Sequence, residues 1–135
     1  MERAVLGGGC FWCTEGAFKH MRGIESALPG YAGGHVDNPT YNAVCNGITG
    51  HAEVVEVLYD ESVISYETIL EVFFTVHDPT QLNRQGNDIG TQYRSAIFYV
   101  DENQKMIAEN VKSRFQEYFD EEIVTEISPI SNYYE

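Results

Sequence analysis

The sequence has few cationic residues, only three cysteines and no long hydrophobic run. Eight lysines and arginines stand against 21 aspartates and glutamates, so the formal net charge is −13 over 135 residues. A surface of that sign repels phosphate backbones, which excludes nucleic acid as an expected partner. No apolar run is long enough to span a bilayer, and the first residues lack the features of a secretory signal. These absences predict a cytoplasmic protein without a membrane partner.

The three cysteines, Cys10, Cys13 and Cys45, are odd in number in a chain with no export signal. A structural disulfide framework is therefore not expected, and catalytic, redox or metal-binding roles remain. The length suits one domain that is large enough for a proper core. We expect a single domain over residues 1–135, and a monomer.

Hydrophobic periodicity predicts the element order β-α-β-β-α-β, followed by one more helix and strand. Strands are expected over 3–7, 24–31 (interrupted at Pro29 and Gly30), 53–59, 95–100 and, at an edge, 123–128. Helices are expected over 11–21 and after the caps Ser65 and Asp101, the last with a stripe that reaches Phe119. The first six elements match the ferredoxin-like, or split β-α-β, pattern. The expected fold is α/β (α+β): a mixed sheet with helices packed on it, extended by one helix and strand.

The most informative stretch is the glycine run at 7–9, which is followed by Cys10, Phe11 and Trp12. Glycines let the backbone turn sharply and approach a ligand closely. Cys10 would lie at the N-terminus of the helix over 11–21, where free N–H groups and the helix dipole favour a thiolate. The two aromatic side chains could form the wall of an apolar pocket. The stretch predicts a reactive thiol that attacks a partly apolar substrate, with the polar loops at 32–50 and 78–93 supplying the rest of the site.

Glu53 is the second candidate residue, at the start of a strand rich in β-branched residues. Val55, Val57 and Tyr59 share its face by the period of two. If that face is buried, desolvation raises the pKa of the carboxyl, and Glu53 becomes a candidate general acid. The alternative is a carboxylate at an exposed strand start, and periodicity does not separate the two.

Tyr41, Tyr93 and Asp88 lie in the two polar loops. A phenol can donate a hydrogen bond to a polar substrate oxygen, although simple packing is the commoner use of one tyrosine among nine. Asp88, which follows Gly-Asn, would ordinarily be a turn residue.

The pattern Cys10-x-x-Cys13 admits two further interpretations. It could be a thioredoxin-like redox pair, or half of a zinc site completed by Cys45 with His51 or His35. No second Cys-x-x-Cys and no His-x-x-x-His supports the zinc site. Cys45 taken alone is more often an inert, buried thiol.

Six motifs follow one another along almost the whole chain, and together they are very specific. They are Gly-Cys-Phe-Trp at 9–12, Gly-Tyr-Ala-Gly-Gly at 30–34, Asn-Pro-Thr-Tyr at 38–41, Gly-His-Ala-Glu at 50–53, His-Asp-Pro at 77–79 and Gln-Gly-Asn-Asp-x-Gly-Thr-Gln-Tyr-Arg-Ser at 85–95. In these motifs and their order the chain resembles the class A peptide-methionine sulfoxide reductases.

The resemblance implies reduction of the S epimer of methionine sulfoxide, free or in oxidised proteins, to methionine. By that resemblance the Cys10 thiolate attacks the sulfoxide sulfur and ends as a sulfenic acid. Glu53 supplies a proton to the sulfoxide oxygen, and Tyr41 and Tyr93 hydrogen-bond that oxygen. The resemblance implies no metal and no organic cofactor.

Three more residues receive roles from the same resemblance. Phe11 and Trp12 form the apolar slot that grips the substrate S-methyl group. Asp88 matches a family residue that helps to place the substrate and the polar network of the site.

The chain departs from the family pattern in its recycling cysteines. Many members continue with a glycine-rich tail that carries one or two of them, whereas this chain has no cysteine after Cys45. We therefore expect a catalytic domain without that tail, whose sulfenic acid is resolved by Cys13, by Cys45 or by an external thiol. Thioredoxin, glutaredoxin or a small thiol would be the reductant.

Two other functions remain open. A general thiol–disulfide oxidoreductase needs only Cys10 and Cys13, but it leaves Glu53 and the block at 88–93 unexplained. A module that binds oxidised methionine without turnover is the other, and the intact Cys10, Glu53 and both tyrosines argue against it.

Overall fold

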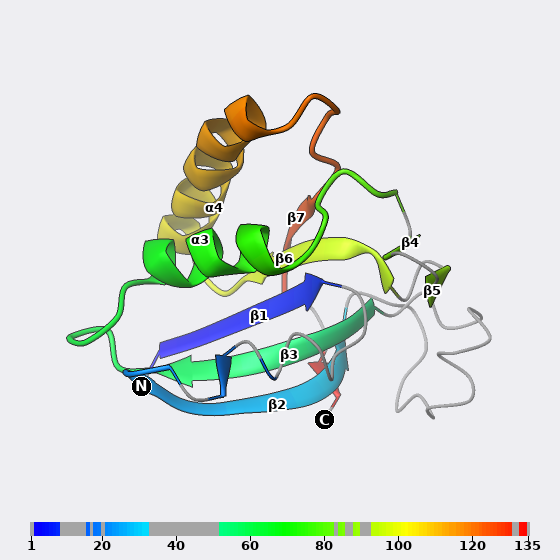
Figure 1. Cartoon of the computed structure of the whole chain (residues 1–135). Coiled ribbons are helices and arrows are strands. Elements are labelled where there is room, and N and C mark those ends of the chain that lie inside the picture. The colour runs from blue at the N-terminus through cyan, green and yellow to red at the C-terminus, as the bar shows by residue number, and fades with distance from the viewer. Residues whose placement is uncertain are drawn as a thin grey trace.

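The computed structural model describes residues 2–8, 16, 18–19, 21–32, 52–82, 84–85, 88–89, 93–130 and 133–134 (Figure 1). A six-stranded sheet runs through this part of the chain. Its strands are β1 (Glu2–Gly8), β2 (Ile24–Ala32), β3 (Ala52–Tyr59), β6 (Ser95–Tyr99), β7 (Glu126–Pro129) and β8 (Tyr133–Tyr134). A separate two-stranded hairpin pairs β4 (Arg84–Gln85) with β5 (Asp88–Ile89).

The strand order across the sheet is β7-β6-β1-β3-β2-β8. All neighbours are antiparallel except β6 and β7, which are parallel. The four central strands, β6-β1-β3-β2, have the arrangement of the split β-α-β pattern, because β3 lies between β1 and β2. The predicted fold class is confirmed, and β7 adds the expected edge strand.

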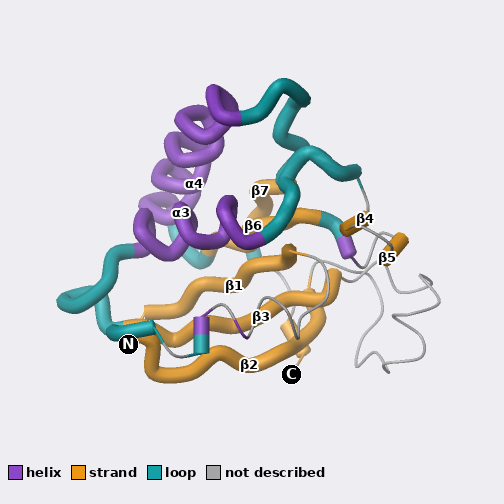
Figure 2. The backbone as a smooth tube through the Cα atoms, viewed as in Figure 1, coloured by secondary structure: helices purple, strands orange, loops and turns teal. Residues whose placement is uncertain are grey.

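Helices α3 (Tyr66–Val76) and α4 (Glu102–Phe115) pack on the same face of the sheet (Figure 2). The Ser65 side chain caps α3 by accepting a hydrogen bond from the Thr68 N–H, and Asp101 caps α4 by accepting one from the Gln104 N–H. Both caps were predicted, because such side chains satisfy N–H groups that have no partner within the helix. Neither helix, nor any other in the described residues, is long and apolar enough to cross a membrane.

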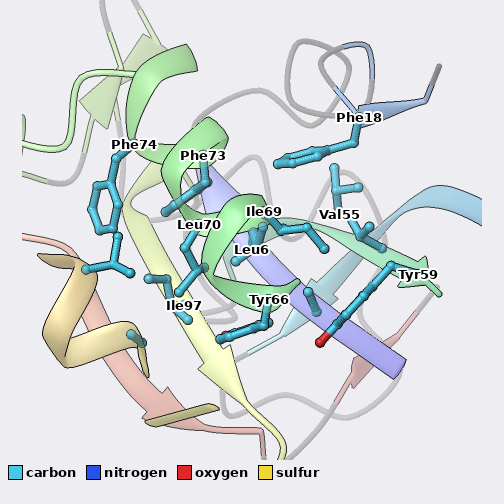
Figure 3. Close-up of a cluster of buried hydrophobic side chains, with 14 of the residues drawn as sticks. Leu6, Phe18, Val55, Tyr59, Tyr66, Ile69, Leu70, Phe73, Phe74 and Ile97 are labelled. Atoms are coloured by element: carbon cyan, nitrogen blue, oxygen red, sulfur yellow. The ribbon is translucent and has the colours of Figure 1, made fainter. Parts of the chain in front are cut away.

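One face of α3 forms the centre of the hydrophobic core (Figure 3). The apolar positions repeat with the helical period, so they lie on one side and point at the sheet. The fully buried side chains of α3 are Ile69, Leu70, Phe73 and Phe74, and they meet Leu6, Val55 and Ile97 of the strands. Phe18 joins the same cluster, and it and Gly16 are helical, while most of the helix expected over 11–21 lies outside the described residues.

Three predicted boundaries are wrong. Strand β2 continues through Pro29 and Gly30 instead of breaking there, because β8 pairs only with Tyr31 and Ala32, so Pro29 has a paired strand on one side only and lies along an open edge. Strand β7 begins three residues later than predicted. Helix α4 ends at Phe115, and the short 3₁₀ helix η2 (Gln116–Tyr118) separates it from Phe119.

We predict that Gly23→Ala destabilises the fold by at least about 1 kcal/mol. Gly23 has a φ of +92°, and a Cβ there would lie 2.7 Å from Cγ2 of Ile64. Urea unfolding of the two proteins measures the difference. The control is Gly16→Ala, a helical position where a Cβ has nothing within 4 Å and where alanine is tolerated or favoured. Equal stability of the Gly23 variant and the native chain would contradict the prediction.

Candidate active site

The candidate site lies where β1 ends and β3 and β6 begin. Gly8, the last residue of β1, pairs with Ser95, the first residue of β6. On the other side Leu6 pairs with Val55, two residues after Glu53, and a Cβ at Gly7 would lie 3.2 Å from the carbonyl oxygen of Glu53. Because both neighbours run against β1, the C-terminal end of β1 meets the N-terminal ends of β3 and β6 at one edge of the sheet (Figure 1).

This register places three strand ends at the same edge, and each lies next to a sequence-predicted site residue along the chain. Cys10 follows Gly8 by two residues, Tyr93 precedes Ser95 by two, and Glu53 is the second residue of β3. The sequence itself did not show that these three segments meet, because the meeting depends on the strand order.

Glu53 is buried, with 3 % of its surface exposed. Its neighbours on the same strand face, Val55, Val57 and Tyr59, all belong to the main hydrophobic core. The alternative of an exposed carboxylate at the strand start is therefore wrong. Desolvation disfavours the charged form of a carboxyl in such surroundings.

The other predicted residues are described in part or lie outside the described residues. Tyr93 is half-buried, and Asp88 lies in β5 with only its backbone described. The remaining predicted site residues, and every ligand of the zinc alternative, lie outside the described residues: Cys10, Phe11, Trp12, Cys13, His35, Tyr41, Cys45 and His51.

Sequence reasoning gave no role to His77, although the residue belongs to the motif at 77–79. His77 is the C-cap residue of that helix. Its Nδ1 lies 2.6 Å from the carbonyl oxygen of Phe73, and its Nε2 lies 2.7 Å from Oγ of Ser95. Ser95 Oγ is also 2.7 Å from Oγ1 of the buried Thr125. The signal available in the sequence was the motif at 77–79, in which a histidine ends an otherwise apolar helix face.

The protonation state of His77 and the donor of each hydrogen bond in this network can be assigned from the bonding partners. A carbonyl oxygen only accepts, so His77 Nδ1 carries the hydrogen that is donated to Phe73. Burial lowers the pKa of His77 to about 4, so the ring is neutral near pH 7 and Nε2 accepts. The Ser95 hydroxyl must then donate to His77, and it accepts from the Thr125 hydroxyl.

Hydrogen bonds also hold the residues after His77 in place. The Asp78 carboxylate accepts hydrogen bonds from the backbone and side chain of Thr80 and from Gln81, and these bonds hold its pKa below the usual range. The Gln85 side chain bonds both the N–H and the carbonyl of Asp78. The hairpin β4–β5, which contains Asp88, is thereby fixed to the end of α3.

A salt bridge holds the segment that carries Tyr93. Arg94 Nε donates to Glu126 at 3.0 Å, and the Arg94 side chain is largely buried. Together with the Ser95–Thr125 bond, this contact joins the start of β6 to the start of β7.

Comparison with known proteins agrees with this arrangement. The family model described as "Peptide methionine sulfoxide reductase" matches residues 2–135. The chain belongs to the peptide methionine sulfoxide reductase family. It is an oxidoreductase that reduces methionine sulfoxide with electrons from thiols.

Individual relatives support the same assignment. The enzyme MsrA of Saccharolobus solfataricus is 56 % identical over all of this chain, which spans 76 % of that protein. Reduced Mxr1 of Saccharomyces cerevisiae superposes with a TM-score of 0.94 at 37 % identity, over 99 % of this chain and 78 % of Mxr1. Mxr1 in complex with Trx2 gives a TM-score of 0.76 at 26 % identity, over 99 % of this chain and 79 % of that one.

We predict that His77 makes the reductase lose stability as the pH falls from about 6.5 to about 4. The unfolded histidine titrates near 6.5 and the folded one near 4, so the unfolded state takes up the proton first and gains stability in that window. The full shift corresponds to about 3 kcal/mol. Urea unfolding at pH 7, 5.5 and 4.5 measures it for the native chain and for His77→Gln, in which all other titrating groups are the same. A difference between the two proteins that does not change with pH would contradict the prediction.

Proposed function

We propose that Cys10 is the nucleophile and Glu53 the proton donor in reduction of the S epimer of methionine sulfoxide, free or in oxidised proteins. One observation carries the proposal: Glu53 is buried on the strand beside the one that leads into Cys10. Family membership supplies the reaction, and the strand register supports the assignment of these two residues to it.

The first half-reaction balances with one proton. The Cys10 thiolate attacks the sulfoxide sulfur while Glu53 protonates the sulfoxide oxygen, which makes the sulfur a better electrophile. The attack forms a bond between the Cys10 sulfur and the substrate sulfur. Transfer of the protonated oxygen to the Cys10 sulfur then breaks this bond and the S–O bond of the substrate, which leaves Cys10 as a sulfenic acid. Substrate sulfur gains two electrons and Cys10 sulfur loses two, and methionine departs.

Glu53 suits proton donation because of where it lies. Burial among apolar side chains favours the neutral, protonated carboxyl, and a proton held near neutral pH is what a general acid needs. A strand in the middle of a sheet also fixes its backbone, so the carboxyl has a defined position relative to the end of β1.

We assign the remaining roles from the family motifs. Tyr41 and Tyr93 hydrogen-bond the sulfoxide oxygen, and Phe11 and Trp12 enclose the S-methyl group. Asp88 places the substrate within the polar network. The role of Tyr93 is supported by its position, because it precedes Ser95, the pairing partner of Gly8, by two residues.

The second half-reaction uses thiols. Cys13, Cys45 or an external thiol attacks the sulfenic acid, which releases water and forms a disulfide, and a further thiol reduces that disulfide. We propose thioredoxin as the reductant, supported by the complex of yeast Mxr1 with Trx2. Glutaredoxin or a small thiol would serve in the same step.

The surroundings in which the protein works follow from this chemistry. A cycle that consumes thiols fits the cytoplasm, where thiols are kept reduced. The net charge of −13 disfavours nucleic acid as a partner. We propose that the working unit is a monomer, because the chemistry assigned above uses residues of one chain.

We predict that Glu53→Gln lowers the single-turnover rate of methionine release by about 10²–10⁴-fold, the usual contribution of general acid catalysis. Glutamine keeps the shape of the side chain but cannot transfer the proton. The matched control is Glu56→Gln on the same strand, because Glu56 lies on the opposite face and pairs with Arg3. If both variants react at the native rate, Glu53 is not the acid.

We predict that Cys13→Ser and Cys45→Ser each keep the first reductive step. The measurement mixes reduced protein with S- or R-methionine sulfoxide without a reductant, and counts methionine released and thiols lost. About one methionine per chain from the S epimer only is expected from each variant. In the native chain, loss of two thiols identifies an internal resolving cysteine, and loss of one identifies an external thiol. No methionine from either epimer in the native chain would contradict the proposed function in favour of a binding module.

A further inference from the structure

We propose that His77 is a positioning residue for Cys10, which it reaches through Gly8 and Ser95. The proposal rests on the proposed role of Cys10 as the nucleophile. It assigns a task to a half-buried histidine that no step of the reaction uses directly.

The first step of the argument is the close contact at Gly8. A Cβ at this position would lie 3.1 Å from Cε1 of Phe73, 3.2 Å from Cγ of His77 and 3.4 Å from its Nδ1. The end of α3 therefore packs directly on the backbone of β1, in space that any side chain at position 8 would occupy. The rings of Phe73 and His77 also pack on each other, with centroids 4.2 Å apart.

The second step is the fixed orientation of the His77 ring. Its two nitrogens bond to the carbonyl of Phe73 and to the hydroxyl of Ser95, so the ring cannot rotate without breaking both bonds. Ser95 is the residue that pairs with Gly8 across the sheet. His77 thus packs against Gly8, and it is hydrogen-bonded to Ser95, which pairs with Gly8 in the sheet.

The third step is the anchor behind Ser95. Its hydroxyl also bonds to Thr125, and the carbonyl of Thr125 accepts a hydrogen bond from Nζ of Lys112 on α4 at 3.1 Å. Next to Thr125, the N–H of Val124 donates to the carbonyl of Pro79 at 2.8 Å. The network therefore connects α3, β6, the entry to β7 and α4, all of which are rigid elements of the core.

The last step is the short path to the nucleophile. Two residues of extended chain span at most about 7 Å, and Cys10 follows Gly8 by two residues. A shift of the Gly8 backbone therefore also shifts Cys10. A misplacement of about 1 Å at a reacting group can cost about 10²-fold in rate. A residue that fixes Gly8 therefore acts on the rate of attack, and not on the affinity for the substrate.

The test separates positioning from stability by a single-turnover experiment. His77→Phe keeps a ring of similar size over Gly8 but loses both hydrogen bonds, and Ser95→Ala removes the bond to His77 with little change in volume. We expect each to lower the rate constant at saturating S-methionine sulfoxide by about 10- to 100-fold. The amplitude stays at about one methionine per folded chain, and the half-saturating concentration changes less than threefold.

The matched control is Gln104→Leu at the opposite end of β1. The Gln104 side chain is buried and bonds to the carbonyl of Arg3 and the N–H of Val100, so its loss also removes buried hydrogen bonds. It should lower the urea midpoint yet leave the single-turnover rate unchanged. A purely structural role of His77 would give the same pattern as this control: a lower amplitude or midpoint with the native rate constant, and that result would overturn the proposal.

Two further variants, Thr125→Val and Cys10→Ser, complete the experiment. If His77→Phe does not fold, Ser95→Ala and Thr125→Val decide, and Thr125→Val should have the smaller effect because it leaves the bond between Ser95 and His77 intact. Cys10→Ser must abolish methionine release in the same assay. If it does not, the proposed function fails, whereas native rates in the Ser95 and His77 variants with an inactive Cys10→Ser reject the positioning role alone.

Discussion

Backbone hydrogen bonds hold β1 between two antiparallel neighbours, and this pairing decides which strand ends meet. It places Gly8, two residues before Cys10 in the sequence, beside Ser95, and it places Leu6 beside Val55, which follows Glu53 by two residues on β3. A parallel neighbour would have put the start of its strand at the far edge of the sheet. The meeting of the end of β1, a buried carboxyl and the start of β6 is thus a property of strand direction.

Burial of the Glu53 carboxyl at this edge of the sheet is energetically unfavourable. Glu53 has 3 % of its surface exposed, and the side chains of Val55 and Val57 on its strand face are apolar. Burial of this kind is unfavourable for the charged form of a carboxyl. Strand β3 is central, because it pairs with β2 from Ala52 to Tyr59 and with β1 from Val55 to Tyr59, and this position supplies the fixed surroundings in which such a group is tolerated.

Local patterns predicted the regular elements well, since apolar periodicity and the caps Ser65 and Asp101 are set by residues within a few positions of each other. Predictions failed where the outcome depends on a distant partner. Pro29 reads as a strand break until the extent of β8 shows that one side of β2 is open there. His77 reads as one more apolar position until β6 and Thr125 bring hydroxyl groups to its ring. Glu53 was ambiguous for the same reason, because the burial of a strand face depends on elements that are distant in the sequence.

The state of His77 also bears on which group can give up a proton near the end of β1. An imidazole close to a thiol would ordinarily be the first candidate for proton exchange at neutral pH. Here the Nδ1 hydrogen is donated to a carbonyl and the Nε2 lone pair accepts from Ser95, so neither nitrogen is available to the substrate. Burial keeps the pKa of the ring near 4, which removes it from proton transfer in the physiological range. In the proposed reaction the proton for the sulfoxide oxygen comes from another acid, Glu53, which is a buried carboxyl among the described residues at this edge of the sheet.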